Sequence, residues 1–177
     1  ALYAYAVRVF DSETGETQAV FPLELSALSD AVFSGEDILI YAGEGGVRAY
    51  DLEVGEELWA GGPATCLSLS ADGSAVAAVH QGESVAVVYD TATGKKRAAI
   101  PMGKSQETAY NTSLPDPEDN LFALNGDGTR LAVSFADGSL TIFDVYDEGN
   151  HLEIYDTSAF YHFEGGFYGP YFAFSAY

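Results

Sequence analysis

Short apolar runs alternate along this chain with turns that are rich in glycine and acidic residues. Residues 38–41, 85–89 and 140–143 consist mainly of aliphatic and aromatic side chains and lie between such turns, a pattern typical of β-strands. Two runs around a short glycine turn predict a β-hairpin. Because no stretch shows a helical apolar period of useful length, the pattern predicts an all-β protein built from antiparallel hairpins.

Three aspartates, Asp11, Asp51 and Asp90, each follow an aromatic residue and precede a glycine turn. They recur about every 40 residues, a spacing that indicates stacked copies of one structural unit. A looser fourth copy contains Asp144 and ends in Gly149. A carboxylate shortly before a glycine turn commonly accepts backbone N–H bonds and stabilises the turn. We therefore interpret these positions as structural turn residues: Asp11, Gly15, Asp51, Gly55, Asp90 and Gly94.

Each complete unit contains four predicted strands in antiparallel order. Four short strands in about 40–45 residues form the blade of a β-propeller, whereas immunoglobulin-like sandwiches lack this internal period and solenoid repeats are shorter or helical. We therefore predict one β-propeller domain, 1–177, of about four blade equivalents. Its parts are a partial blade (1–23), two blades (27–60 and 64–101), a blade with an insertion at 102–119 (102–157), and the first strand of a further or closing blade (158–177).

The sequence begins and ends inside a unit, so three arrangements stay open. One chain can close a small ring by pairing its last strand with its first ones, or two chains can form one larger ring as a homodimer. The third arrangement is a piece of a larger intact propeller, which we favour because both ends stop within a unit and residue 1 is not methionine. In each case, unpaired strand edges favour association.

The chain is strongly acidic, with 27 Asp and Glu against 7 Lys and Arg and a formal net charge of −20. This balance argues against binding to nucleic acid, which depends on basic side chains at phosphates, and against binding to anionic membrane surfaces. It favours an extracellular or cell-envelope setting. Cys66 is the single cysteine, which excludes an internal disulfide, and its apolar neighbours predict a buried structural thiol.

Residues 49–59, Ala-Tyr-Asp-Leu-Glu-Val-Gly-Glu-Glu-Leu-Trp, resemble the quinoprotein repeat Ala-x-Asp-x-x-Thr-Gly-Lys-x-x-Trp, with Val54 in place of threonine and Glu56 in place of lysine. Together with the order of strands and glycine turns, this stretch makes the chain similar to bacterial propellers of the WD-repeat-like and quinoprotein-like superfamily. In enzymes of that superfamily, pyrroloquinoline quinone and a calcium ion lie on the ring axis near an adjacent cysteine pair. A single cysteine cannot form that pair, so the resemblance implies a shared blade plan and nothing about activity.

The remaining polar residues do not form a reactive set. The histidines match neither a metal site nor a nucleophile–base arrangement in their spacing, so we predict no catalytic, cofactor-binding or metal-binding residue. They are His80, His151 and His162. One alternative is the oxygen-rich segment 115–120, which can either hold calcium or form a solvated acidic loop. Its carboxylates are Asp116, Glu118 and Asp119.

Two segments are candidates for binding. Residues 102–119 lengthen one connection between blades, and long loops on a rigid scaffold commonly carry binding sites. In the aromatic tail, Phe167 and Tyr168 lie among glycines. Exposed aromatic rings can stack on sugars or contact a protein partner, whereas a neighbouring blade would cover them.

These observations predict a non-catalytic β-propeller scaffold that presents loops for protein or glycan binding. We expect it to be a module of a larger bacterial envelope or secreted protein. The alternative is a fragment of a quinoprotein-type or other propeller enzyme whose catalytic residues lie outside this chain. A third reading is a structural half-ring that dimerises into a closed propeller.

Overall fold

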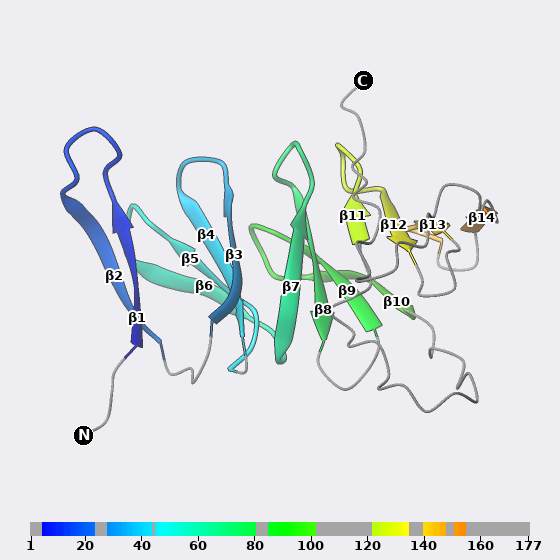
Figure 1. Cartoon of the computed structure of the whole chain (residues 1–177), viewed down its shortest axis with the longest axis horizontal. Helices are drawn as coiled ribbons and strands as arrows, with labels where there is room; N and C mark the ends of the chain where they lie inside the picture. The colour runs from blue at the N-terminus through cyan, green and yellow to red at the C-terminus, as the bar shows by residue number, and fades with distance from the viewer. Residues whose placement is uncertain are drawn as a thin grey trace, which may run out of the picture.

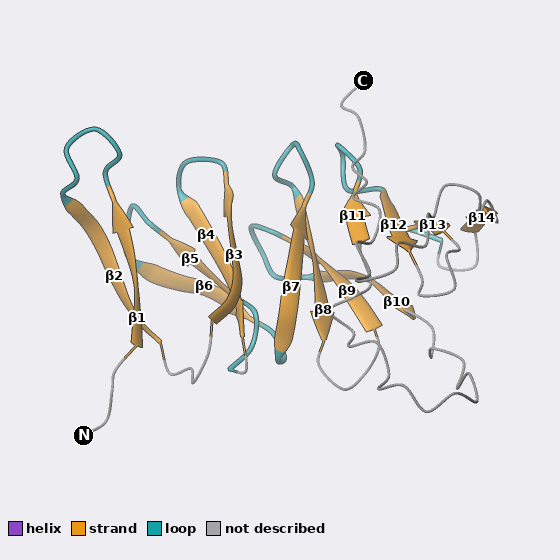
Figure 2. Ribbon diagram, in the orientation of Figure 1, coloured by secondary structure: helices purple, strands orange, loops and turns teal. Residues whose placement is uncertain are grey.

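The computed structural model describes residues 5–23, 28–43, 45–80, 85–101, 122–134, 140–147 and 151–154. These residues form fourteen strands, and the described part of the ribbon in Figure 2 is coloured as strand or loop throughout, without a helix. The strands make four separate antiparallel sheets, one of two strands and three of four strands. The all-β class and the repeated antiparallel sheets predicted from the sequence are therefore confirmed. The insertion 102–119 and the segment 158–177 lie outside the described residues.

The first and second sheets come from the first third of the chain. The first sheet consists of β1 (Tyr5–Phe10) and β2 (Thr17–Leu23). The second sheet consists of β3 (Leu28–Ser34), β4 (Ile38–Gly43), β5 (Arg48–Asp51) and β6 (Glu56–Ala60).

The third and fourth sheets repeat the plan of the second. The third sheet consists of β7 (Ala64–Leu69), β8 (Ala75–His80), β9 (Val85–Asp90) and β10 (Lys96–Pro101). The fourth sheet consists of β11 (Phe122–Leu124), β12 (Arg130–Ser134), β13 (Leu140–Asp144) and β14 (His151–Ile154).

In each four-stranded sheet, strands that are neighbours in sequence pair with each other, so the first strand of the sheet lies at one edge. We call these first strands, β3, β7 and β11, the inner strands. β3 contacts β7, and β7 contacts β11, so the three sheets meet along their inner strands. Figure 1 shows the four sheets following one another in a row in chain order.

The third sheet is buried on both faces, which explains why β8 lacks the alternation of a half-exposed strand. All six residues of β8 are buried. Val76 and Ala78 belong to the core shared with the second sheet, whereas Ala77 and Val79 belong to the core shared with the fourth sheet. Successive side chains of a strand point to opposite faces, so one apolar run serves two interfaces. Its small alanines allow the flanking sheets to approach closely.

The first sheet packs on the second through a smaller cluster. Val9 of β1 and Leu39 of β4 are buried together, and Tyr50 and Leu52 pack against them. Each such fully buried aliphatic side chain contributes about 1.5–3 kcal/mol to the free energy of unfolding.

Candidate functional site: the seams between sheets and the turn face

The repeated aspartates accept hydrogen bonds from their own turns. In each turn, one carboxylate oxygen accepts backbone N–H groups two or three residues later, at 2.7–3.1 Å. The glycine that closes each turn has a positive φ of 66–73°, a conformation that favours glycine because it has no Cβ. The pairs are Asp11 with Glu13 and Thr14, Asp51 with Glu53 and Val54, and Asp90 with Thr93.

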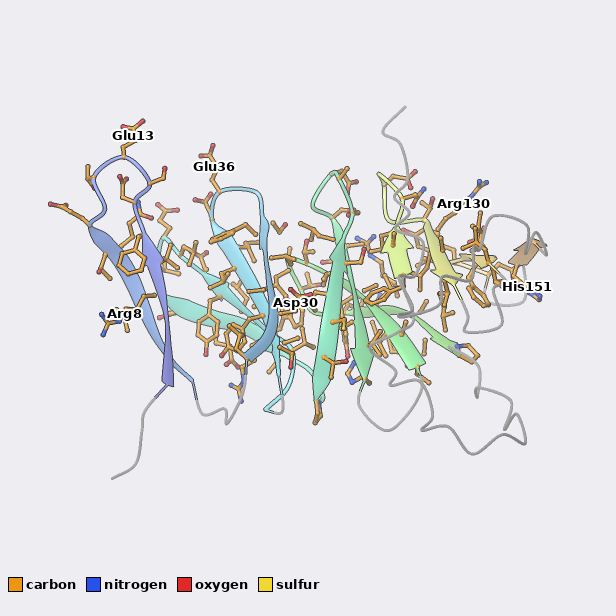
Figure 3. The ribbon with its side chains drawn as sticks, in the orientation of Figure 1. Arg8, Glu13, Asp30, Glu36, Arg130 and His151 are labelled. Carbon is orange, nitrogen blue, oxygen red and sulfur yellow. The ribbon has the colours of Figure 1, made fainter. Side chains whose placement is uncertain are left out.

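The first and third hairpin turns of each four-stranded sheet lie at the same end of that sheet, because two antiparallel reversals return the chain to that end. Backbone hydrogen bonds join the two turns within a sheet, from Leu52 N–H to Asp37 O and from Thr91 N–H to Ser74 O. We call this surface the turn face, and Figure 3 shows Glu13 and Glu36 projecting from it. It comprises residues 11–16, 35–37, 52–55, 71–74, 91–95 and 125–129.

The turn face keeps a negative charge down to acidic pH. Hydrogen bonds to the ionised carboxylate stabilise that form and lower its pKa. The pKa is lowered at four turn aspartates, and the largest cause is the Thr14 N–H for Asp11, the Ser74 N–H for Asp72, the Arg97 side chain for Asp90 and the Thr129 hydroxyl for Asp127. Only Asp90 forms an ion pair among the described members of this set, with 2.8 Å between its Oδ2 and Arg97 Nη2.

The inner strands are joined by hydrogen bonds from a backbone N–H to a side chain of the preceding sheet. Leu67 N–H donates to Asp30 Oδ2 at 2.8 Å, and Leu124 N–H donates to Ser68 Oγ at 3.0 Å. Figure 3 shows Asp30 between β3 and β7.

The two links repeat with the same offset. Ser34, Ser70 and Asn125 end the inner strands at their turns, and alignment on these residues makes Leu67 equivalent to Ala31 and Leu124 equivalent to Leu69. We call the contacts between neighbouring sheets seams. In both of these seams, the acceptor side chain on one inner strand thus binds the N–H group that lies one aligned position further along the next inner strand. A repeated polar link of this kind specifies the relative position of neighbouring sheets, because a slipped register would leave a buried donor unpaired.

Trp59 joins the outer halves of the second and third sheets. Its indole Nε1 donates to Thr91 O at 2.7 Å, and its ring stacks on Tyr89 with centroids 5.4 Å apart and planes 24° apart. The ring also covers Gly94, where a Cβ atom would collide with the indole. Sequence reasoning missed this seam. The available signals were the single tryptophan that ends one copy of the repeat and the glycine of the following copy.

The histidines lie in different parts of the structure. His80 is buried at the end of β8, with its Nε2 2.8 Å from the Tyr89 hydroxyl. His151 begins β14, is exposed, and lies with its ring centroid 5.8 Å from that of Phe143. His162 lies outside the described residues. In the part of the chain that the structure describes, no group of three or more His, Cys, Asp or Glu side chains is placed to hold a metal ion.

The residues predicted for partner or calcium binding fall in undescribed segments: Asp116, Glu118, Asp119, Phe167 and Tyr168. Their roles therefore stay predictions. Cys66 lies on β7 and is half-buried, a less complete burial than its apolar neighbours predicted. Neighbouring strands cover Cys66 only partly, because β7 lies at the edge of its sheet.

Comparisons with protein-family models and with curated proteins give no match. The class that the fold itself defines is an all-β protein of repeated antiparallel sheets, joined face to face by apolar cores and side-chain hydrogen bonds. Within the described ranges, no helix has the length and apolar character that crossing a membrane requires.

Proposed function

We propose that this chain is a non-catalytic scaffold of the β-propeller type that presents loops to bind a protein or a glycan, as a module of a larger bacterial envelope or secreted protein. The observation that carries the proposal is the repeated link between inner strands, from Leu67 to Asp30 and from Leu124 to Ser68. In a propeller, four-stranded sheets pack face to face around an axis along which their innermost strands lie. Repetition with one offset is what such an arrangement requires.

The binding role follows from the contrast between a rigid framework and its connections. Side chains on both faces of the third sheet are buried against neighbours, which leaves turns and loops as the variable surface. The segments proposed for contact are the insertion 102–119, with Asp116, Glu118 and Asp119, and the pair Phe167 and Tyr168. Aromatic rings suit either a sugar face or a protein hot spot.

A second candidate function is a fragment of a quinoprotein-type or other propeller enzyme whose catalytic residues lie outside this chain. One observation favours it: Trp59, the last position of the repeat that resembles the quinoprotein repeat, packs on Gly94 and bonds to Thr91 O in the following copy. The contact gives the tryptophan of that repeat a structural role. It supports a shared way of joining blades, which the scaffold proposal also uses.

Binding assays on the original chain and two variants test the first proposal. The chain, Phe167→Ser/Tyr168→Ser, and a variant with 102–119 replaced by a short Gly-Ser linker are applied to a glycan array and cross-linked to bacterial envelope proteins. We expect a retained partner that is lost in at least one variant at unchanged melting temperature. Val54→Ser, an exposed turn substitution outside these segments, is the matched control. A partner retained equally by all variants contradicts the assignment of these segments. A cofactor-site cysteine pair or a hydrolase domain in a longer protein that contains this chain would favour the enzyme fragment.

A further inference from the structure

The second sheet carries an exposed apolar area on its inner strand, β3. Phe33 of β3 is 53 % exposed and Leu28 of the same strand is 46 % exposed. Phe33 is paired with Leu39 across the β3–β4 ladder, and directly paired residues of an antiparallel ladder lie on the same face. Leu39 is buried against Val9 of the first sheet. The exposed ring of Phe33 is therefore continuous with the interface between the first and second sheets.

The equivalent positions in the next two sheets are covered. Alignment on the inner-strand turns makes Phe33 equivalent to Leu69 and Leu124. Leu69 packs against the core shared with the second sheet, and Leu124 is buried in the core shared with the third sheet. In both cases, the preceding sheet has four strands. The sheet before Phe33 has two strands among the described residues, and we relate the exposure of Phe33 to this smaller width.

Among the strands that the structure describes, none pairs with the second edge of β1. Its aspartate turn makes β1 equivalent to β5 and β9, each of which pairs with a strand on either side. Among the described residues, β1 pairs with β2 alone. An unpaired strand edge offers backbone donors and acceptors to an added strand. Two strands beside β1 would give the first sheet the width of the others and cover Phe33.

The backbone donor for the polar link between the first and second sheets also has a different partner. Ala31 N–H, which is equivalent to the Leu67 N–H that binds Asp30 of the preceding sheet, is bonded here to its own neighbour, Asp30 Oδ1, at 2.8 Å. The donor that serves as an inter-sheet link in the next seam is therefore satisfied locally in this one. A strand with a suitably placed serine or aspartate can replace this local bond.

We propose that the edge of β1 and the face around Phe33 form a docking site for a β-hairpin. This hairpin resembles the inner strands β3 and β7 of this chain, which carry both apolar side chains and side chains that can accept a hydrogen bond. One strand of the hairpin pairs with β1, and the other covers Phe33 and Leu28. The inference rests on the proposed scaffold architecture and adds a specific site and a specific ligand class to it. The occupant is a peptide hairpin, because only two added strands restore the repeated seam.

The probe is a fluorescent synthetic peptide of residues 64–80, which contain β7 and β8, with Cys66→Ser to prevent oxidation. We expect saturable binding of one peptide per full-length chain, and protection of β1 amides from hydrogen exchange when it binds. Phe33→Asp should weaken binding about ten- to a hundredfold, because an apolar contact is replaced by a desolvated charge. Leu58→Asp, on exposed outer strand β6, should leave it unchanged, and a scrambled peptide should not bind.

Three results overturn the proposal. They are no binding of the peptide, equal binding to Phe33→Asp, or β1 amides already protected in the chain without peptide, which would show that another part of the chain or a second copy occupies the site. Circular dichroism and thermal melting establish that both variants fold. Because the readouts are confined to β1 and Phe33, failure here is distinct from failure of partner binding through residues 102–119.

Discussion

At the scale of single residues, the repeated aspartates show how a local polar pattern becomes structure. Each carboxylate binds N–H groups of its own turn, and the following glycine supplies the positive φ that completes it. Asp90 differs from Asp11 and Asp51 because Arg97 also binds it, by 2.8 Å between Arg97 Nη2 and Asp90 Oδ2. Arg97 additionally donates to Ser74 O, so this side chain connects the β7–β8 and β9–β10 turns of the third sheet.

Asp90 makes the free energy of unfolding fall as the pH becomes acidic. Its pKa is lowered in the folded chain, first by Arg97 and then by Thr93, so its contribution is present above the unfolded pKa of about 3.9 and is lost as pH falls through the folded value. We expect Asp90→Asn to lower the free energy of unfolding by about 1–2 kcal/mol at pH 7. This difference should shrink below about pH 4.

Urea unfolding followed from pH 7 to pH 2.5 measures this effect. Glu36→Gln, at an exposed hairpin tip (Figure 3), is the control and should leave the pH dependence close to that of the original chain. A destabilisation by Asp90→Asn that stays constant through the acidic range would show that the carboxylate acts through packing and not through its charge.

At the scale of elements, the structure depends on how neighbouring sheets meet. Apolar faces bring the sheets together without specifying a register, because burial is not directional. Side-chain links to backbone groups add the specificity: Asp30 and Ser68 along the inner strands, and Trp59 at the outer half. The Trp59 seam requires a residue without Cβ at position 94, which makes Gly94 more constrained than its counterpart Gly55.

Matched glycine substitutions test this seam. Both glycines have positive φ, +66° for Gly94 and +73° for Gly55, but only at Gly94 would a Cβ collide with Trp59. We expect Gly55→Ala to lower stability by about 1 kcal/mol through backbone strain alone. Gly94→Ala should cost more, approaching the 3–5 kcal/mol typical of Trp→Ala in a core, which is also the expectation for Trp59→Ala.

Trp59 is the only tryptophan in the chain, so its fluorescence reports this seam directly. Gly94→Ala should shift the emission to longer wavelength as the indole becomes exposed, while Gly55→Ala should leave it unchanged. Equal denaturation midpoints and equal emission for the two variants would argue against a docked indole.

At the scale of the whole molecule, charge and apolar packing oppose each other. A net charge of −20 repels the sheets from one another, and the four turn aspartates with lowered pKa keep their own negative charges in mild acid. By comparison, the stabilisation from the apolar cores between sheets does not depend on the screening of charges by salt. Stability should therefore rise when salt reduces the repulsion.

We expect the melting temperature to increase by about 2–8 °C between roughly 0.01 M and 1 M sodium chloride, where the Debye length falls from about 30 to 3 Å. Light scattering in the same solutions checks that the chain, of 18.8 kDa, does not change its association state. A melting temperature that falls with salt would indicate that attractive ion pairs outweigh the repulsion among carboxylates.

The sequence alone determined the local features of this protein. Apolar runs and glycine turns specified the strands and hairpins, and the spacing of Asp11, Asp51 and Asp90 specified that the hairpins recur as similar sheets. These features follow from interactions between residues close in the chain, because strand alternation and turn hydrogen bonds involve neighbours. That is why the all-β class was predictable without the structure.

Only the tertiary structure decided which faces meet and where they stay uncovered. Trp59 meets Thr91 and Gly94, Asp30 meets Leu67, and Phe33 lies exposed although its equivalents Leu69 and Leu124 do not. Face-to-face packing joins residues distant in sequence, and a period-two pattern marks a face as apolar without naming its partner. The docking site that we propose at β1 rests on the number of described strands that pair in the first sheet, a property of the assembled sheets.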